Sequence, residues 1–362
     1  MLPQPSLSFT LPSIHDKTRL KCRVYHPDPP QQQPFKHAAV VAHPYAPMGG
    51  CYNDPIVDLV AGTLVQLGFV VATFNFRGAT SSEGRTSWTA KPEQGDYISV
   101  VGFLAYYLYY LSSSSPPPPP PLPSNDDDDD DDDIQPKSKP TMLLAGYSYG
   151  AMIMTRIPPL ETILGYFATP GIHSAEADIR FRAQHLAAEE ARNLGSIRFG
   201  DAGEPRKRSS FQREERIQKS VRDLLAPHKT KTGRGTGTGT GTGTGNCLEE
   251  IKGIAFRSAY IAVSLPVGLM TRLATLSLGS TPMEFEGKFV ENPTLVVYGD
   301  QDGFISHRRM RLWINALKKR NGGEKVRCVE VKGAGHFWVE HEAVFILRDA
   351  VGNFAMELIR AE

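Results

Sequence analysis

The stretch at residues 141–151 constrains the fold of this chain more than any other part of the sequence. Its apolar first half predicts a buried strand, and its second half carries Gly146-x-Ser148-x-Gly150 and leads into helix-compatible sequence. A serine at so sharp a strand-to-helix turn stands clear of the backbone, and the two glycines let the strand and the helix approach closely. Since 33 of the 362 residues are glycine, chance alone could produce this pattern. Ser148 is therefore a candidate nucleophile whose partners must be sought downstream.

Apolar runs alternate with helical patterns along most of the chain. The predicted strands are residues 7–11, 19–25, 37–42, 69–76, 141–147, 294–298 and 325–331. The predicted helices are residues 54–67, 93–111, 174–192, 307–319 and 340–359. One further strand is expected at residues 258–265, with residues 162–168 as the alternative. The alternation predicts an α/β fold with a doubly wound, mostly parallel sheet covered on both faces.

Two insertions are predicted within a single domain that spans residues 1–362. Residues 112–140 hold serines, six consecutive prolines and eight aspartates, which cannot join a packed core, so this insertion is predicted to be disordered. Residues 157–253 form the second insertion, of which residues 201–246, with their Gly-Thr repeat, are also predicted to be disordered. Ligands bind beyond the carboxyl ends of parallel strands, so the helical part of this insertion could act as a lid there.

Two side chains that a serine nucleophile requires follow later strands. Serine needs a histidine as general base, and the histidine needs an acid that orients it. The predicted strand 294–298 leads into Asp300 and Asp302, and the predicted strand 325–331 leads into His336 between small residues. Asp302 is preferred as the acid because Asp300, directly after the strand, fits a turn-stabilising role. The order Ser148, Asp302, His336 predicts one catalytic constellation at the carboxyl ends of the strands.

Two backbone N–H groups would complete such a site by holding the developing oxyanion. The first is predicted to come from Tyr149, which follows the nucleophile. The second is predicted in the loop after residues 37–42, where Pro44 has no N–H to give; Tyr45 is preferred and Ala46 is the alternative.

Composition excludes several classes of function. The formal net charge of +1 gives no global field for nucleic acid or membrane, and no run is apolar and long enough to span a bilayer. The four cysteines are scattered, so neither a metal site nor a disulfide framework is predicted, and no cofactor is expected. Reduced thiols and the absence of a signal segment at the printed N-terminus predict a cytoplasmic protein. The oligomeric state stays open.

Three motifs together resemble those of a known family. They are the His43-Pro44…Gly49-Gly50 loop, the Asn75-Phe76-Arg77-Gly78 turn and the Gly146–Gly150 turn. The chain is thereby similar to small serine hydrolases of the α/β-hydrolase fold, and its low-complexity inserts look like those of filamentous-fungal members. The resemblance implies the fold and a Ser-His-Asp triad; it is weak on substrate, because this fold hosts many chemistries.

Function is predicted from these features as follows. A serine hydrolase acting on a small-molecule acyl ester or thioester is preferred. A peptidase or amidase on the same triad, and a non-catalytic scaffold whose inserts recruit partners, are the alternatives. Arg77 could bind an anionic substrate, although pairing with a loop carbonyl or a carboxylate such as Glu93 or Asp96 is preferred. Trp88 could line the pocket or cover the sheet, and the sequence does not decide between these.

Overall fold

An eight-stranded sheet forms the centre of the molecule. The computed structural model describes residues 1–28, 35–113, 139–198, 219, 251, 254–267, 286–320 and 322–361. The strands are β1 (Leu7–Pro12), β2 (Arg19–Tyr25), β3 (His37–Ala42), β4 (Val70–Phe74), β5 (Thr141–Tyr147), β6 (Arg257–Val263), β7 (Thr294–Gly299) and β8 (Val326–Val331). Their order is β1-β2-β4-β3-β5-β6-β7-β8, in which β2 is antiparallel to both neighbours and all later pairs are parallel. The predicted α/β fold with a mostly parallel sheet is confirmed.

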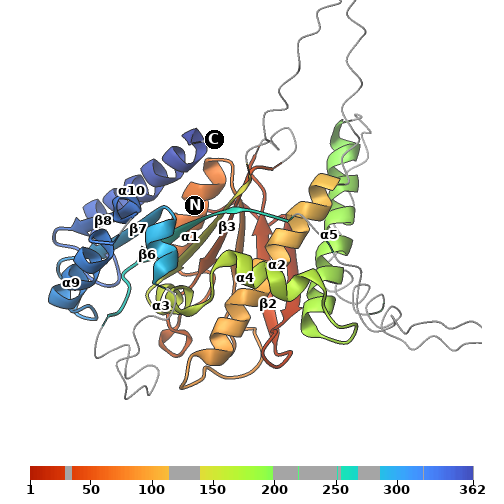
Figure 1. Ribbon diagram of the computed structural model, residues 1–362, viewed down its shortest axis with the longest axis horizontal. Helices are drawn as coiled ribbons and strands as arrows, with labels where there is room; N and C mark the ends of the chain where they lie inside the picture. Colours follow the sequence, from red (N-terminus) through yellow and green to blue (C-terminus); the bar gives the residue numbers. More distant parts are fainter. Residues whose placement is uncertain are drawn as a thin grey trace, which may run out of the picture.

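Helices cover both faces of the sheet (Figure 1). One face carries α1 (Pro55–Gln66) and α10 (His341–Arg360), which pack against each other. The other carries α2 (Lys91–Ser113), α3 (Tyr149–Arg156), α4 (Leu160–Ala168), α5 (Ala175–Arg198), α8 (Gly287–Glu291) and α9 (His307–Lys318). The described residues also form two short 3-10 helices, η1 (Ala46–Met48) and η2 (Gly323–Lys325).

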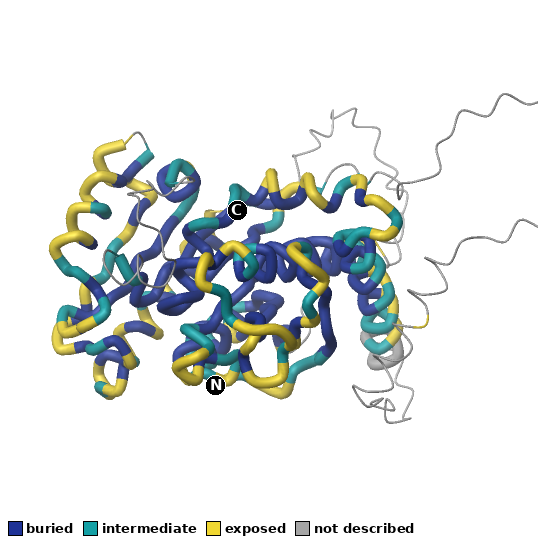
Figure 2. The backbone as a smooth tube through the Cα atoms, turned by 90° about the horizontal axis from the view of Figure 1, so that it is seen from below, coloured by how far each residue is buried: buried dark blue, intermediate teal, exposed yellow. Residues whose placement is uncertain are grey.

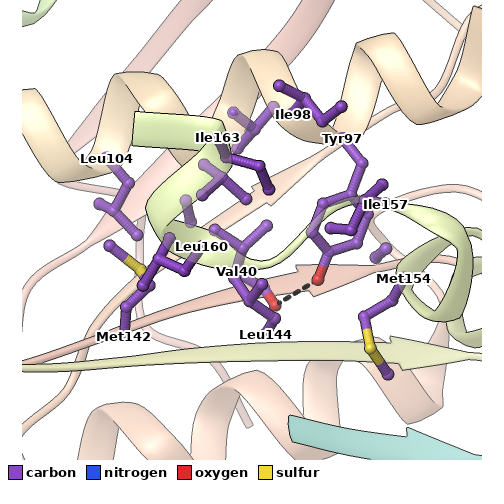
Figure 3. Close-up of a cluster of buried hydrophobic side chains, with 14 of the residues drawn as sticks. Val40, Tyr97, Ile98, Leu104, Met142, Leu144, Met154, Ile157, Leu160 and Ile163 are labelled. Carbon is purple, nitrogen blue, oxygen red and sulfur yellow. Dashed lines mark hydrogen bonds between the residues drawn. The ribbon is translucent and has the colours of Figure 1, made fainter. Parts of the chain in front are cut away.

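Strand β5 shows why its sequence is continuously apolar. Met142 and Leu144 point to the α2 face, while Leu143 and Ala145 point to the α1 face, and all four are buried. Figure 2 shows the buried residues, in dark blue, gathered in the middle of the molecule, with exposed residues, in yellow, around them. On the α2 face, Met142 and Leu144 lie in a cluster with side chains of α2, α3 and α4 (Figure 3).

A buried tyrosine fixes α2 to the centre of the sheet. The hydroxyl of Tyr97 lies 3.3 Å from the carbonyl oxygen of Val40 (Figure 3) and 2.9 Å from that of Ala145, and its proton is shared between these two acceptors. These two carbonyls belong to the neighbouring strands β3 and β5. The hydroxyl therefore holds α2 against the two strands that lead to the oxyanion loop and to Ser148.

The additional strand lies where the sequence favoured it. Strand β6 spans Arg257–Val263, and the alternative at residues 162–168 lies in helix α4. Helix α5 packs against α2 and β1 (Figure 1), beside the sheet and not over the carboxyl ends of its strands. Most of the two predicted disordered segments, residues 114–138 and all but one of residues 199–250, lie outside the described residues.

Candidate active site

Ser148 stands at a sharp turn between β5 and α3. Its backbone has φ 53° and ψ −114°, outside the regions that most residues prefer, and its N–H donates to the carbonyl of Val263 at 2.8 Å. A side chain at Gly150 would begin 2.6 Å from the carbonyl oxygen of Ala42. The glycine is therefore required by the close approach of α3 to β3, and this approach presents the Ser148 hydroxyl at the carboxyl end of the sheet.

A continuous chain of hydrogen bonds joins Ser148, His336 and Asp302. The hydroxyl oxygen of Ser148 lies 2.9 Å from Nε2 of His336, and Nδ1 of His336 lies 2.9 and 2.8 Å from the two carboxylate oxygens of Asp302. Ser148 and His336 are 9% and 8% exposed, while Asp302 is 1% exposed. When Nδ1 donates to the carboxylate, Nε2 is left as an acceptor for the serine hydroxyl. This arrangement can withdraw the serine proton.

Two loops at strand ends position the acid and the base. Asp302 lies in the loop after β7, where Oδ1 also accepts from the N–H of Phe304 at 2.9 Å. His336 lies in the loop after β8, and its ring centroid is 4.5 Å from that of Phe304. The hydroxyl of Tyr147 donates to the His336 carbonyl at 2.7 Å. The ring of His336 is therefore positioned by its contact with Phe304, and the loop that carries it is held by the bond to its backbone carbonyl.

Asp300, the alternative acid, has a different partner. Its Oδ1 accepts from the N–H of Gly333 at 2.6 Å, and its own N–H donates to the carbonyl of Val331 at 3.0 Å. These bonds join the loop after β7 to the last residue of β8 and to the loop that follows it. Asp300 thus holds together the two loops that carry Asp302 and His336, and its carboxylate makes no hydrogen bond to His336 in the described part of the chain.

The two residues chosen as oxyanion donors, Tyr45 and Tyr149, line the same cavity as Ser148. Tyr45 precedes the η1 turn, and Tyr149 is the first residue of α3; their ring centroids are 5.1 Å apart. The first N–H groups of a helix have no partner within it, so the Tyr149 N–H is free of the helical ladder. In the loops and turns that the structure describes, the Tyr45 N–H donates to no backbone carbonyl. Both residues line the cavity beside Ser148.

His43 fixes the loop that carries Tyr45. Its Nδ1 donates to the Pro44 carbonyl at 2.6 Å, and its Nε2 accepts from the N–H of Phe76 at 2.9 Å. Burial lowers the pKa of His43 to about 4, so the ring is neutral at physiological pH, as these two bonds require. Sequence reasoning missed this role, although a histidine at the end of a buried strand was a signal for it.

A cavity of about 360 Å³ opens beside the serine hydroxyl. Its lining is mainly apolar and comprises Pro44, Tyr45, Met48, Gly49, Gly50, Asp54, Tyr147, Ser148, Tyr149, Met152, Pro266, Phe304, His336 and Phe337. Asp54 is the only acidic residue among these described lining residues. The sequence places Asp54 at a helix start but carries no sign that it also faces the nucleophile.

Neither Arg77 nor Trp88 lines this cavity. The guanidinium of Arg77 makes two bonds to the buried carboxylate of Asp96, at 2.7 and 3.0 Å, and another to Asp16 at 2.8 Å. Trp88 is 68% exposed. Arg77 is thus engaged with carboxylates of its own chain, and Trp88 lies outside the pocket.

Among the described residues, helices α4 and α5 do not contribute to the lining of this cavity. Helix α3 runs back from Ser148, so the segment that follows it starts near the amino ends of the strands, where β6 also begins. Most of the insertion that is expected to supply a lid, including residues 199–218 and 220–250, lies outside the described residues, so the lid stays a prediction.

Among the residues that the structure describes, no group of three or more histidine, cysteine, aspartate or glutamate side chains could hold a metal ion. No helix among them is both long enough and apolar enough to cross a membrane.

Comparison with known proteins is consistent with this architecture. The model of the alpha/beta hydrolase family matches residues 39–347, whereas no curated protein sequence matches the chain. Among solved structures, the chain is similar to a putative alpha/beta hydrolase of unknown function, ATU1826 from Agrobacterium tumefaciens, at 14% identity and a TM-score of 0.50, covering 99% of this chain and 98% of that one. It is also similar to the esterase Pf2001 from Pyrococcus furiosus, at 12% identity and a TM-score of 0.50, covering 97% and 90%.

These structural similarities, at such low identities, concern the fold. The match to the family model supports membership of the family, because the matched residues make up most of the sequence and include Ser148, Asp302 and His336. The chain therefore belongs to the alpha/beta hydrolase family.

Proposed function

We propose that the chain is a serine hydrolase that cleaves an ester or thioester of a small molecule through an acyl-enzyme on Ser148. The observation that supports it most is the unbroken set of hydrogen bonds from Ser148 through His336 to Asp302. The strained backbone of Ser148 adds to this, because such strain persists where the surrounding structure needs the side chain in one place.

In this mechanism, the Ser148 oxygen attacks the carbonyl carbon of the substrate while His336 Nε2 takes its proton. Asp302 stabilises the resulting imidazolium and keeps the ring in the required orientation. The N–H groups of Tyr45 and Tyr149 donate to the oxyanion of the tetrahedral intermediate. His336 then returns the proton to the leaving alcohol or thiol. Water, activated by the same histidine, releases the acyl group and restores Ser148.

The cavity suggests the size and character of the substrate. Its volume of about 360 Å³ is at the small end of the range for small-molecule pockets. Apolar side chains such as Met152 and Phe304 lie beside Ser148 in its wall and would contact a short acyl or alcohol group. A cytoplasmic location is part of the proposal, supported by Cys22, Cys51 and Cys328, which form no disulfide with another described residue.

Labelling with a fluorophosphonate probe tests this proposal. The wild-type chain should form a covalent adduct, and Ser148→Ala should form none. His336→Gln should label much more slowly, whereas His341→Gln is the matched control because His341 starts α10 on the surface. A panel of acyl esters, thioesters and aminoacyl amides then identifies the bond cleaved. Faster turnover of amides than of esters would favour a peptidase, and an unlabelled, inactive wild-type chain would refute the proposal.

A further inference from the structure

Asp54 places a carboxylate in the wall of the cavity that contains Ser148. One of its oxygens, Oδ1, caps helix α1 by accepting from the N–H groups of Ile56 at 2.9 Å and Val57 at 3.4 Å. The other oxygen, Oδ2, makes no hydrogen bond or ion pair with any residue that the structure describes. Capping therefore uses one oxygen and leaves the second available to a molecule in the cavity.

The surroundings of this carboxylate solvate it poorly. Burial raises the pKa of Asp54, while the two capping N–H groups and the nearby His336 act in the opposite direction. A charge that is partly removed from water and lacks a counter-charge is costly, and a ligand that brings the counter-charge recovers that cost. Binding pockets commonly combine apolar walls with a few such polar groups, which orient the ligand.

The other walls suit a cation. The rings of Tyr45, Tyr149 and Phe304 line the same cavity, and aromatic faces attract ammonium groups. No lysine or arginine is among the described lining residues, so His336, when it holds the proton of Ser148, is the one residue among them that carries a positive charge. A neutral hydroxyl group could bond to the carboxylate but could not balance its charge. The chemistry thus favours an ammonium group over a neutral donor.

We propose that Asp54 is a substrate-binding residue that selects esters carrying an ammonium group close to the scissile bond. The inference rests on the proposed serine hydrolase function, because the ester would occupy the cavity next to Ser148. It extends that function by naming the charge of the preferred substrate.

Two pairs of esters test the preference, because the members of each pair have nearly the same shape and differ in charge. Acetylcholine and 3,3-dimethylbutyl acetate carry the difference on the alcohol side. The 4-nitrophenyl esters of alanine and of 2-methylpropanoic acid carry it on the acyl side, where the ammonium group also activates the carbonyl, so for that pair the change of the ratio on mutation is decisive. The ratio of kcat/KM for the charged ester to that for its neutral isostere should be about tenfold or more in at least one pair, as expected for attraction between opposite charges at a partly buried site.

Asp54→Asn is the informative variant. Asparagine caps helices about as well as aspartate, so the bonds to Ile56 and Val57 can persist while the charge is lost. The charged-to-neutral ratio should then fall by about tenfold or more. Asp58→Asn is the matched control, since it removes a carboxylate from the first turn of the same helix, but Asp58 accepts from the N–H of Leu2 at 3.0 Å and lies outside the cavity lining. It should keep the wild-type ratio. Equal ratios in the wild type and Asp54→Asn would overturn the inference.

Calorimetry with choline separates this inference from the proposed reaction. Choline should bind Ser148→Ala, and the added change Asp54→Asn should weaken its binding about tenfold or more. Asp54-dependent binding without any Ser148-dependent ester hydrolysis would support the ammonium site and refute the hydrolase. If hydrolysis depends on Ser148 but the charged-to-neutral ratio of kcat/KM is the same with and without Asp54→Asn, the ammonium site is refuted and the hydrolase proposal stands. Absence of both effects would overturn both proposals.

Discussion

The hydroxyl of Tyr147 donates a hydrogen bond of 2.7 Å to the backbone carbonyl of His336, 189 residues away in the sequence. Tyr147 directly precedes Ser148, and its ring centroid lies 5.7 Å from that of His336. The last residue of β5 thus supports the loop that carries the histidine. The nucleophile and the candidate base are joined through this bond as well as through their side chains.

Replacing Tyr147 with phenylalanine should loosen the His336 loop while it preserves the packing of the ring. A lost hydrogen bond of this kind is worth about 1 kcal/mol, so kcat/KM for an ester should fall up to about fivefold. Steady-state kinetics and a melting curve measure the two effects. Unchanged kinetics together with a lower melting temperature would mean that the bond supports the fold but not the geometry of the site.

Asp302→Asn should lower kcat by about 10³–10⁴-fold, because an asparagine cannot stabilise the imidazolium and favours the wrong tautomer of His336. Asp300→Asn is the natural comparison: an amide oxygen can still accept from the Gly333 N–H, which Asp300 now bonds at 2.6 Å. Its activity should stay within about threefold of the wild type. Stopped assays on a 4-nitrophenyl ester compare the two, and a greater loss in Asp300→Asn would reverse the assignment of the acid.

Gly150→Ala should destabilise the chain by several kcal/mol or prevent folding, since the new carbon would lie 2.6 Å from the Ala42 carbonyl oxygen. Gly165→Ala should do the opposite. Gly165 is exposed within α4 and has open space around it, so alanine should stabilise the helix by about 0.5–1 kcal/mol. Urea unfolding of both variants gives the comparison. Equal stability of the two variants would argue against the close approach of α3 and β3.

Arg77→Ala should cost about 3–5 kcal/mol of stability, because it leaves the fully buried carboxylate of Asp96 without its partner. Arg311→Ala provides a surface control. Arg311 bonds Glu330 at 2.6 Å, but its side chain is 63% exposed and this ion pair is screened by water, so its loss should change stability little. Chemical unfolding measures both. A stable Arg77→Ala chain that fails only with anionic substrates would instead show Arg77 to be a binding residue.

Acid should destabilise the chain through His43. Its folded pKa of about 4 is below the usual 6.5, so between these two pH values the unfolded chain binds a proton that the folded chain excludes. This contribution to stability is complete above pH 6.5 and is lost as the pH falls toward 4; it amounts to at most about 3 kcal/mol. His43→Gln should show a smaller difference in unfolding free energy between pH 7.5 and pH 5. An unchanged difference would contradict the assignment of a neutral, buried ring.

The sequence predicts those parts of the candidate site that are encoded locally. Ser148, Asp302 and His336 each follow an apolar strand directly, and parallel strands bring their carboxyl ends to one edge. The order of these residues along the chain then suffices to predict that they meet. The strand boundaries also agree closely, because buried strands are short apolar runs between polar or glycine-rich turns.

Contacts between distant segments escape such reasoning. The partner Asp16 of Arg77 lies 61 residues away in the sequence, and nothing near either residue indicates the pair. Asp54 is recognisable as a helix cap, but its position in the cavity depends on how α1 sits against β5. The apolar run at residues 162–168 is short enough for a strand; the buried positions Ile163, Leu164 and Phe167 have the helical spacing that decides the matter.

Because the strands are parallel, the active-site residues lie at one edge of the sheet and the starts of β5 and β6 lie at the other. Strands β5 and β6 both begin at the edge of the sheet opposite to Ser148. A described segment ends at residue 113, before β5, and another begins at residue 254, just before β6. A strand of six or seven residues is about 20 Å long. Each junction is therefore about 20 Å from the serine hydroxyl. We therefore expect sequence gained or lost at these two junctions to leave the geometry around His336 unchanged. They are natural positions for inserting a tag or a reporter domain in an active chain.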